Sequence, residues 1–349
     1  GVHICRVPAK GGSPVPAAGL PATAYGVSIS TLRSGGTFRV ALVDARTDSG
    51  LRMIDLRASP PGGRISTWTP FCESTRVQWP GRFSRDGSKV SFTSDRSGLA
   101  QVLVARRDGT QMRTLTSFEG GALGLASWSP DGRFLVFDAV DDESRTDLWI
   151  VGTDGGPLRR LTHDDRRESN AEWSRDGRWI YYAAAAPSRP QIWRIPAAGG
   201  APVQITTEGG IDPRESPDGR SVYFLEPPSG PYGNPFWAPA TLKRVSTDGG
   251  PGRPVLSGLR QGRWDVTDTG IVFLTDAGGL APNPETPDAL EFFGFDQGRP
   301  RRLGELAFPV TSRGYSAPRV LTVSPDGRWA IVSHMDRRER DIVVADRFR

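Results

Sequence analysis

A short hairpin motif recurs along the chain and constrains its fold more than any other feature. Three copies align without gaps, and their glycines Gly87, Gly132 and Gly177 are evenly spaced. In the turn S-[PR]-D-G, the Asp side chain can bond its own backbone and Gly supplies the positive φ that closes a β-hairpin. The motif therefore predicts a tandem array of hairpins. The clear copies are FSRDGSKVSF (83–92), WSPDGRFLVF (128–137), WSRDGRWIYY (173–182), ESPDGRSVYF (215–224) and VSPDGRWAIV (323–332), with VTDTGIVFL (266–274) as a degenerate copy.

Each hairpin is followed by two further strand-like segments. A third β-rich strand such as DLWIV (147–151) or QIWRI (191–195) leads to a Gly-Gly turn and a short fourth strand, as in DGGPLRRLT (154–162). Four antiparallel strands per repeat are the signature of a propeller blade. With 42 Gly, 30 Pro and 37% hydrophobic residues, the composition also fits many short strands joined by tight turns. We predict an all-β fold, a β-propeller of four-stranded antiparallel blades.

The number of blades follows from the number of hairpins. Beyond the six hairpins above, strands at 25–30, 38–43 and 51–56 predict one more blade early in the chain, so seven blades are favoured, with six and eight as alternatives. Residues 1–16 resemble two outer strands without a hairpin, which would close the last blade or end a blade further upstream. Because the chain starts at Gly1, we expect it to be the C-terminal portion of a longer protein. The prediction is one domain over 1–349, with blades at 24–68, 79–116, 124–162, 169–206, 211–256, 263–303 and 319–346.

The repeats resemble a known family. The S-[PR]-D-G hairpins, the SDRSG stretch (94–98) and the [IL]-W-x-[IV] third strands are similar to the WD-like propeller repeats of the TolB type, over nearly the whole chain. The ending DIVVADRFR (341–349) also resembles the C-terminal propeller of bacterial proteins that carry a winged-helix DNA-binding domain or a kinase domain. The resemblance implies a sensor or protein-interaction platform of a signalling protein. It also favours the periplasm, with the cytoplasm left open.

One position per blade is a candidate site. The residue two before each hairpin Ser or Thr is polar in all six copies, and such a set could line the mouth of the central channel. Since buried charges need partners, its mixture of Arg with Glu and Asp favours an ion-pair ring over a ligand site. Asn170 and Asp212 precede the inner strand at matching positions and carry the same two interpretations. The ring positions are Arg82, Ser127, Glu172, Arg214, Asp265 and Thr322.

A long loop between the second and third strands of one repeat is the second candidate. It places Tyr232, Phe236 and Trp237 among Pro and Gly residues. Exposed aromatic side chains supply contact area at low entropic cost, so the loop would bind a protein or peptide partner. The alternative is that these rings pack against a neighbouring blade.

The motifs of common catalytic chemistries do not occur. His3, His163 and His334 lie in no HExxH or GxSxG context, and the chain has no Walker or dinucleotide loop. Cys5 and Cys72 form no CxxC pair, so neither a metal nor a cofactor is expected. The hairpin aspartates are read as turn residues rather than paired acids. They are Asp86, Asp131, Asp176, Asp218 and Asp326.

These features favour a non-catalytic, monomeric ring that binds a protein or peptide. The net charge is +5, but the arginines are scattered among aspartates, which argues against direct nucleic-acid binding. No apolar run is long enough for membrane insertion. Two enzymatic alternatives stay open: the gating propeller of a prolyl-oligopeptidase-like peptidase, and a metal-dependent propeller lyase or lactonase.

Overall fold

The computed structural model divides the chain into two compact units. One comprises residues 1–48 and 335–349, and the other comprises residues 49–334. All of its assigned elements are β-strands. The structure describes residues 5–6, 15–16, 24–31, 38–59, 61–74, 76, 78–119, 123–141, 145–185, 189–227, 239–275, 287–308, 310 and 319–348.

Two antiparallel pairings are described for residues 1–48 of the smaller unit. Strand β1 (Cys5–Arg6) pairs with β2 (Val15–Pro16). Strand β3 (Ala24–Thr31) pairs with the first part of β4 (Phe38–Asp55), in a register that places Thr31 opposite Phe38.

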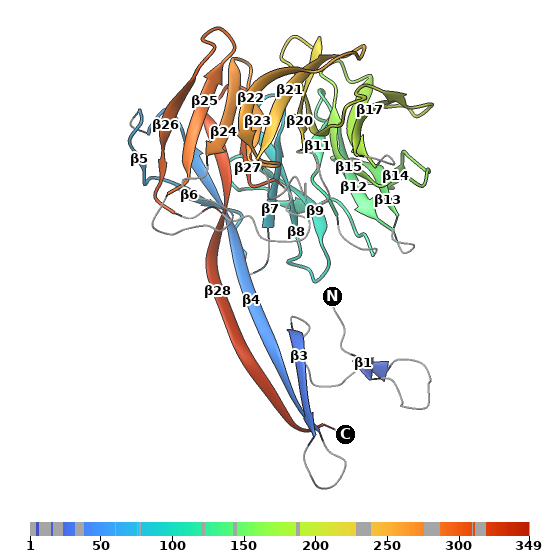
Figure 1. Cartoon of the computed structure of the whole chain (residues 1–349), viewed down its shortest axis with the longest axis vertical. Coiled ribbons are helices and arrows are strands. Elements are labelled where there is room, and N and C mark those ends of the chain that lie inside the picture. The colour runs from blue at the N-terminus through green and yellow to red at the C-terminus, as the bar shows by residue number, and fades with distance from the viewer. Residues whose placement is uncertain are drawn as a thin grey trace. The chain divides into compact units, whose positions relative to one another are not determined.

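The larger unit is a propeller of six mainly antiparallel sheets, and most of their strands are labelled in Figure 1. Four of the sheets are each made of four consecutive strands. The first is β7 (Gln78–Phe83), β8 (Lys89–Ser94), β9 (Gln101–Arg106) and β10 (Arg113–Thr114), and the second is β11 (Ser127–Trp128), β12 (Phe134–Val140), β13 (Thr146–Gly152) and β14 (Arg159–Arg160). The third is β15 (Glu168–Trp173), β16 (Trp179–Ala184), β17 (Gln191–Pro196) and β18 (Val203–Gln204), and the fourth is β19 (Ile211–Glu215), β20 (Ser221–Glu226), β21 (Ala240–Ser246) and β22 (Arg253–Leu259).

The fifth and sixth blades recruit residues from early in the chain. The fifth has β23 (Trp264–Val266), β24 (Gly270–Thr275), β25 (Ala289–Gly294) and β26 (Pro300–Leu306), with β5 (Arg64–Ile65) added in parallel at its outer edge. The sixth runs from β27 (Leu321–Val323) through β28 (Trp329–Phe348) to β4, and β6 (Thr69–Phe71) pairs with β4 through Met53 opposite Thr69.

This closure corrects the predicted number of blades from seven to six. The segment 51–56, expected as the third strand of a separate early blade, supplies the third strand of the last blade as part of β4. The segments 25–30 and 38–43 do form the expected antiparallel pair, but in the smaller unit. The error arose because a third strand has the same sequence pattern whether its hairpin precedes it or lies at the other end of the chain. Closing the ring in this way leaves fewer unpaired strand edges.

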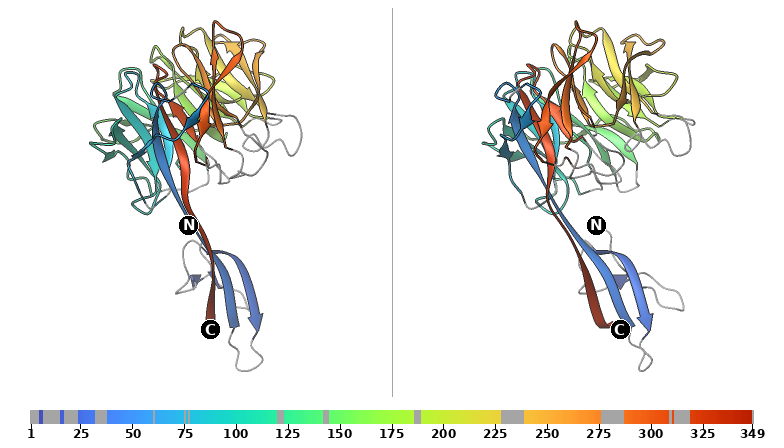
Figure 2. Two further views of the ribbon diagram at one scale, coloured as in Figure 1. Left: turned by 90° about the vertical axis from the view of Figure 1, so that its left-hand side faces the viewer. Right: turned by 60° about the vertical axis from the view of Figure 1, so that its left-hand side comes forward.

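The ring is held together by apolar cores between neighbouring blades. Contacts between successive inner strands run from β7 through β11, β15, β19, β23 and β27 and return to β7. One core joins Val102 and Val104 of the first blade to Leu135 and Phe137 of the second. Another joins Phe71 of the closing strand β6 to the first blade, where it meets the ring of Phe92 edge-on. The views in Figure 2 show the blades around the ring. Burial of these side chains is the main stabilising contribution.

The hairpin turn is closed by its own polar side chains. In the second blade, the Ser129 hydroxyl donates to Asp131 at 2.6 Å and accepts the N–H of Phe134 at 2.9 Å. The Asp131 carboxylate also accepts the N–H of Arg133, and these bonds lower the pKa of Asp131. Gly132 follows with a φ of 69°. The Ser-to-Asp bond recurs in the other clear copies, so these aspartates are turn residues, as the repeat predicts.

The second blade departs from the repeat at the end of the sheet opposite its hairpin turn, where the third strand begins. In the first and third blades a Gln side chain at the start of the third strand, Gln101 or Gln191, accepts a hydrogen bond from a Thr hydroxyl. In the second blade Asp147 occupies this position and is paired with Arg160, and Thr162 donates to Glu168 instead. Glu168 is 1% exposed. Its burial, opposed by the bond from Thr162, raises its pKa to about 8.

We expect Glu168→Gln to flatten the pH dependence of stability. The pKa of Glu168 is higher in the folded chain than in the unfolded one. Its contribution to the free energy of unfolding is therefore fully present below about pH 4.3 and is lost as the pH rises towards 8. The free energy of unfolding falls by at most about 1.4 kcal/mol per pH unit from this group. Gln keeps an acceptor for Thr162 and does not ionise. Thermal unfolding at pH 5 and pH 8 should show a smaller loss for the variant than for the parent. Glu208→Gln, at an exposed side chain, is the control, and equal losses in all three proteins would contradict the expectation.

Candidate binding site at the channel mouth

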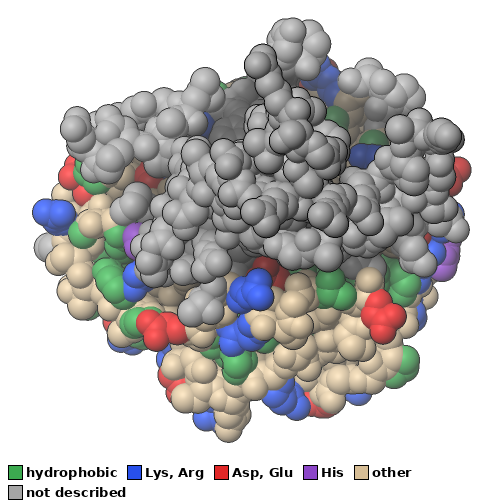
Figure 3. Space-filling model, turned by 90° about the horizontal axis from the view of Figure 1, so that it is seen from below, with side chains coloured by type: hydrophobic (Ala, Val, Ile, Leu, Met, Phe, Trp, Pro, Cys, Tyr) green, Lys and Arg blue, Asp and Glu red, His purple; other side chains and the backbone are tan. Residues whose placement is uncertain are grey.

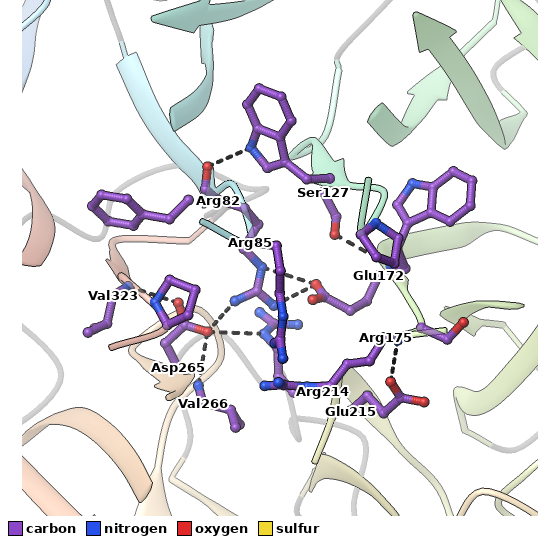
Figure 4. A pocket seen from close by; sticks show the side chains of 16 residues that line it. Arg82, Arg85, Ser127, Glu172, Arg175, Arg214, Glu215, Asp265, Val266 and Val323 are labelled. Atoms are coloured by element: carbon purple, nitrogen blue, oxygen red, sulfur yellow. Dashed lines mark hydrogen bonds and ion pairs between the residues drawn. The ribbon is translucent and has the colours of Figure 1, made fainter. Parts of the chain in front are cut away.

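The inner strands of the six blades bring the predicted ring positions together. In each blade the strand enters its hairpin two residues after this position, so the six side chains meet at one level of the ring. Figure 4 shows five of them lining one pocket, and the sixth, Thr322, donates to Asp265. The contributors are Arg82 of β7, Ser127 of β11, Glu172 of β15, Arg214 of β19, Asp265 of β23 and Thr322 of β27.

Asp265 is the hub of this group and is 1% exposed. One carboxylate oxygen accepts a hydrogen bond from Arg82 and lies 3.7 Å from Nε of Arg214 and 3.7 Å from Nη1 of Arg319. The other oxygen accepts the Thr322 hydroxyl at 3.0 Å and the N–H of Val323 at 2.9 Å. A single carboxylate thus connects strands from the first, fourth, fifth and sixth blades.

Two more carboxylates balance the arginines. Glu172 lies 2.6 Å from Arg82, and Asp212 lies 2.6 Å from Arg214 and 3.5 Å from Arg319. Burial alone would lower the pKa of Arg82, but Asp265 and Glu172 outweigh it and raise that pKa. For Arg214, burial and the neighbouring Arg82 lower the pKa. Three guanidinium groups therefore face three carboxylates, the arrangement that buried charges require.

The network is not saturated with hydrogen bonds. Among the described residues, Nε of Arg214 and Nη1 of Arg319 are buried and have no hydrogen-bond acceptor. Both are held by the longer charge contacts to Asp265 instead. Loss of the negative charge on Asp265 would remove these charge contacts, and the two buried nitrogen atoms would then lack both a hydrogen-bond acceptor and this charge.

The pocket opens towards the hairpin turns. Its volume is about 100 Å³, and the turn residues at its rim include Arg85 and Arg175. Nη1 of Arg175 is 3.1 Å and Nη1 of Arg85 is 3.7 Å from the Asp268 carboxylate. Burial and the nearby Arg175 lower the pKa of Arg85. Two guanidinium groups thus share one half-exposed carboxylate at the mouth.

Asn170 and Asp212 lie outside this pocket and shape the start of the inner strands. Both have a positive φ, 57° and 54°, beside an irregularity in strand register. Asp212 accepts the N–H of Gly262 at 3.1 Å in addition to its pairing with Arg214. The side-chain oxygen of Asn170 accepts a hydrogen bond from Gln261 at 2.9 Å. These contacts fix strand geometry and link neighbouring blades.

Sequence reasoning missed the groups at the rim and one buried partner. Arg85 and Arg175 stand where three other repeats have Pro in the turn, so the alternation S-R-D-G against S-P-D-G was an available signal. Asp268 lies in the degenerate hairpin, at the same position of the motif. Arg319 precedes its strand without a matching residue in the other blades, so no pattern indicated it.

The predicted aromatic loop, with Tyr232, Phe236 and Trp237, lies outside the described residues.

Of the histidines, His163 is exposed and His334 meets the ring of Phe308 edge-on at 5.1 Å. Among the described residues, no three His, Cys, Asp or Glu side chains are placed to hold a metal ion, and no helix is long and apolar enough to cross a membrane. On the face in Figure 3, the described basic and acidic side chains are interspersed.

We expect Asp265→Asn to destabilise the ring by about 3–5 kcal/mol, because it leaves three buried arginines facing only two carboxylates. Asp268→Asn removes a carboxylate that is 48% exposed, and its effect should stay below about 1 kcal/mol. Urea unfolding of the two variants beside the parent measures both. Equal stabilities of the two variants would show that the buried network does not hold the blades.

Comparison with known proteins agrees with this architecture. Residues 110–232 match the model of the TolB beta propeller domain. Uncharacterized protein Atu1656 of Agrobacterium fabrum is 31% identical over 125 residues, which are 35% of this chain and 42% of that protein. Tricorn protease homolog 1 of Streptomyces coelicolor is 33% identical over 104 residues, 29% of this chain and 10% of that protein. The chain thus matches less than half the length of either relative.

Two solved structures share the fold. A protein described as TolB from Agrobacterium tumefaciens superposes with a TM-score of 0.63 at 17% identity, covering 83% of this chain and 99% of that one. TolB from Acinetobacter baumannii gives a TM-score of 0.54 at 15% identity, covering 86% and 66%. These two structures share the propeller fold of the ring, and residues 110–232 are similar to the TolB beta propeller domain.

Proposed function

We propose that the chain is a non-catalytic binding platform that takes an acidic segment of a protein or peptide at the mouth of its channel. The observation that carries this proposal is the pair Arg85 and Arg175, which share the single carboxylate of Asp268 at the rim. An acidic side chain from a partner could replace or join Asp268 there, since Arg is well suited to bidentate contact with carboxylates.

The interior of the pocket supports binding rather than catalysis. Its charged groups are already engaged with one another, and Ser127 Oγ accepts the N–H of Trp173 at 3.4 Å. The described lining contains no His, Cys or Lys side chain that could act as base or nucleophile. The Trp128 indole N–H donates to the carbonyl oxygen of Arg82 at 2.9 Å and is likewise occupied. At the rim, by contrast, two arginines share the carboxylate of Asp268.

The test is capture of partners from a bacterial lysate with the chain as bait. We expect Arg85→Glu combined with Arg175→Glu to lose partners that the parent captures, because the rim then repels an acidic segment. Arg178→Glu is the matched control: its side chain is 79% exposed in the same turn as Arg175 and pairs with Asp176. It should keep the captured set. Thermal unfolding of all three confirms folding, and an identical set from parent and double variant would contradict the proposal.

That the aromatic loop binds a partner stays a prediction, and the same capture assay tests it separately. Changing Tyr232, Phe236 and Trp237 to Ala would reveal a second contact face if it removed partners that the rim variant retains. The wider role we propose is the C-terminal part of a bacterial signalling or regulatory protein, which rests on the resemblance of the repeats.

A second candidate is the propeller of a peptidase. The identity to Tricorn protease homolog 1 favours it, although the match spans 10% of that protein. Sequencing the gene on both sides of the region that codes for this chain separates the two roles. A hydrolase domain would support the peptidase, and a winged-helix or kinase domain would support the signalling role.

A further inference from the structure

One carboxylate lies between the third and fourth blades, where it also lines the pocket at the channel mouth. Glu215 of β19 is 8% exposed. It accepts the hydroxyl of Tyr181 at 3.2 Å and the backbone N–H of Arg175. Arg194, directly opposite Tyr181 in the sheet, adds a nearby positive charge to this tyrosine. The chain thus contains an internal carboxylate that is bound by a tyrosine hydroxyl and a backbone N–H, with an arginine beside the tyrosine.

The next blade repeats the Tyr–Arg pair without the carboxylate. Tyr223 lies opposite Arg244 in the sheet, at the positions of Tyr181 and Arg194. Burial raises the pKa of Tyr223, and the nearby Arg244 opposes this rise. The position that corresponds to Glu215 is Val266 in the fifth blade, one residue before the hairpin Thr. Val266 packs against the core cluster that contains Tyr223. The carboxylate that completes the site in one groove is therefore missing from the other.

The groove between the fourth and fifth blades has a cavity of about 510 Å³. Both Arg244 and Arg253 line it, and among the described residues neither forms an ion pair. Arg253 lies opposite Arg244 and takes the position of Val203 in the third blade, so it adds a second cation. Pro217 takes the position of Arg175 and has no N–H to donate. The second guanidinium group offsets this lost donor.

Apolar surface lies beside the two arginines. The ring of Phe295 is stacked on that of Tyr223 with centroids 5.7 Å apart, and it is 37% exposed. Phe293, Pro254 and Val255 continue the lining. The nearest acidic group, Asp218, is held in its own turn by Ser216 and the N–H of Arg220. A cavity of this size with apolar walls and a few converging polar groups fits a small ligand or a short peptide segment.

We infer that the groove between the fourth and fifth blades binds a carboxylate attached to an aromatic or aliphatic group, with the Tyr223 hydroxyl in the role that the Tyr181 hydroxyl has towards Glu215 and with Arg244 and Arg253 as the cations. The carboxylate would belong to an acidic peptide side chain or to a free organic acid. This site is separate from the channel mouth, since the two pockets share no lining residue.

The test is isothermal titration of the full chain with matched acid and amide probes. The free-acid arm compares 3-phenylpropionate with 3-phenylpropanamide. The peptide arm compares acetyl-Gly-Phe-Glu-Gly-amide with its Gln counterpart. We expect at least tenfold tighter binding of the acid in one arm, and the arm that responds identifies the source of the carboxylate. Equal affinity within both pairs, or no binding of any probe, would overturn the inference.

Variants locate the site. Arg244→Met and Arg253→Met should each weaken the responding acid at least tenfold, and the exposed position of Arg253 makes loss of folding a small risk. Arg159→Met is the matched control, because Arg159 has the same place in the groove between the second and third blades and binds the carbonyl of Ala197.

Val266→Glu should abolish binding by supplying the missing carboxylate internally, whereas Val266→Leu should retain it. Thermal unfolding accompanies each variant. Full binding by a folded Arg253→Met protein would overturn the inference, as would full binding by a folded Val266→Glu protein.

Discussion

The carboxylate of Asp265 is the interaction on which the ring depends most. It connects Arg82, Arg214 and Arg319 with the backbone of the sixth blade, so strands distant in sequence are joined at the axis. Apolar cores lie between neighbouring blades, and one of them extends from the third blade through the fourth to the fifth. The axial network adds a polar connection between the first, fourth, fifth and sixth blades. In it, three arginines face three carboxylates, whereas two arginines share Asp268 at the rim.

Departures from the repeat are where binding chemistry arises in this chain. Residues that recur at the same position in several blades form the turns and the apolar cores. The equivalent residue in another blade shows the structural role of each. Arg85 and Arg175 replace turn prolines and create the charged rim. Val266 takes the position of Glu215 in the fifth blade, and Tyr223 and Arg244 of the fourth blade line a cavity with no carboxylate at that position. Comparing blades within one chain therefore separates structural residues from candidate recognition residues, without any other sequence.

The fold was largely predictable from local pattern, because a turn such as Ser129 to Gly132 is specified by its own side chains. Convergence of Arg82, Glu172, Arg214 and Asp265 was also predictable, since one position per blade must face the axis. The blade count was not, because strand 51–56 pairs with β28 from the other end of the chain. Arg319 and the groove at Tyr223 depend on contacts between blades, which no local pattern reports.

The most direct test of the account is a double-mutant cycle between Arg82 and Asp265. Urea unfolding of Arg82→Met, Asp265→Asn and the double variant gives the coupling free energy between the two side chains. If the axial network joins the blades, the coupling should be about 2 kcal/mol or more, because each single change already removes the buried ion pair between Arg82 and Asp265, which the second change cannot remove again. Additive effects within about 0.5 kcal/mol would contradict the account and leave the apolar cores as the main bond between blades.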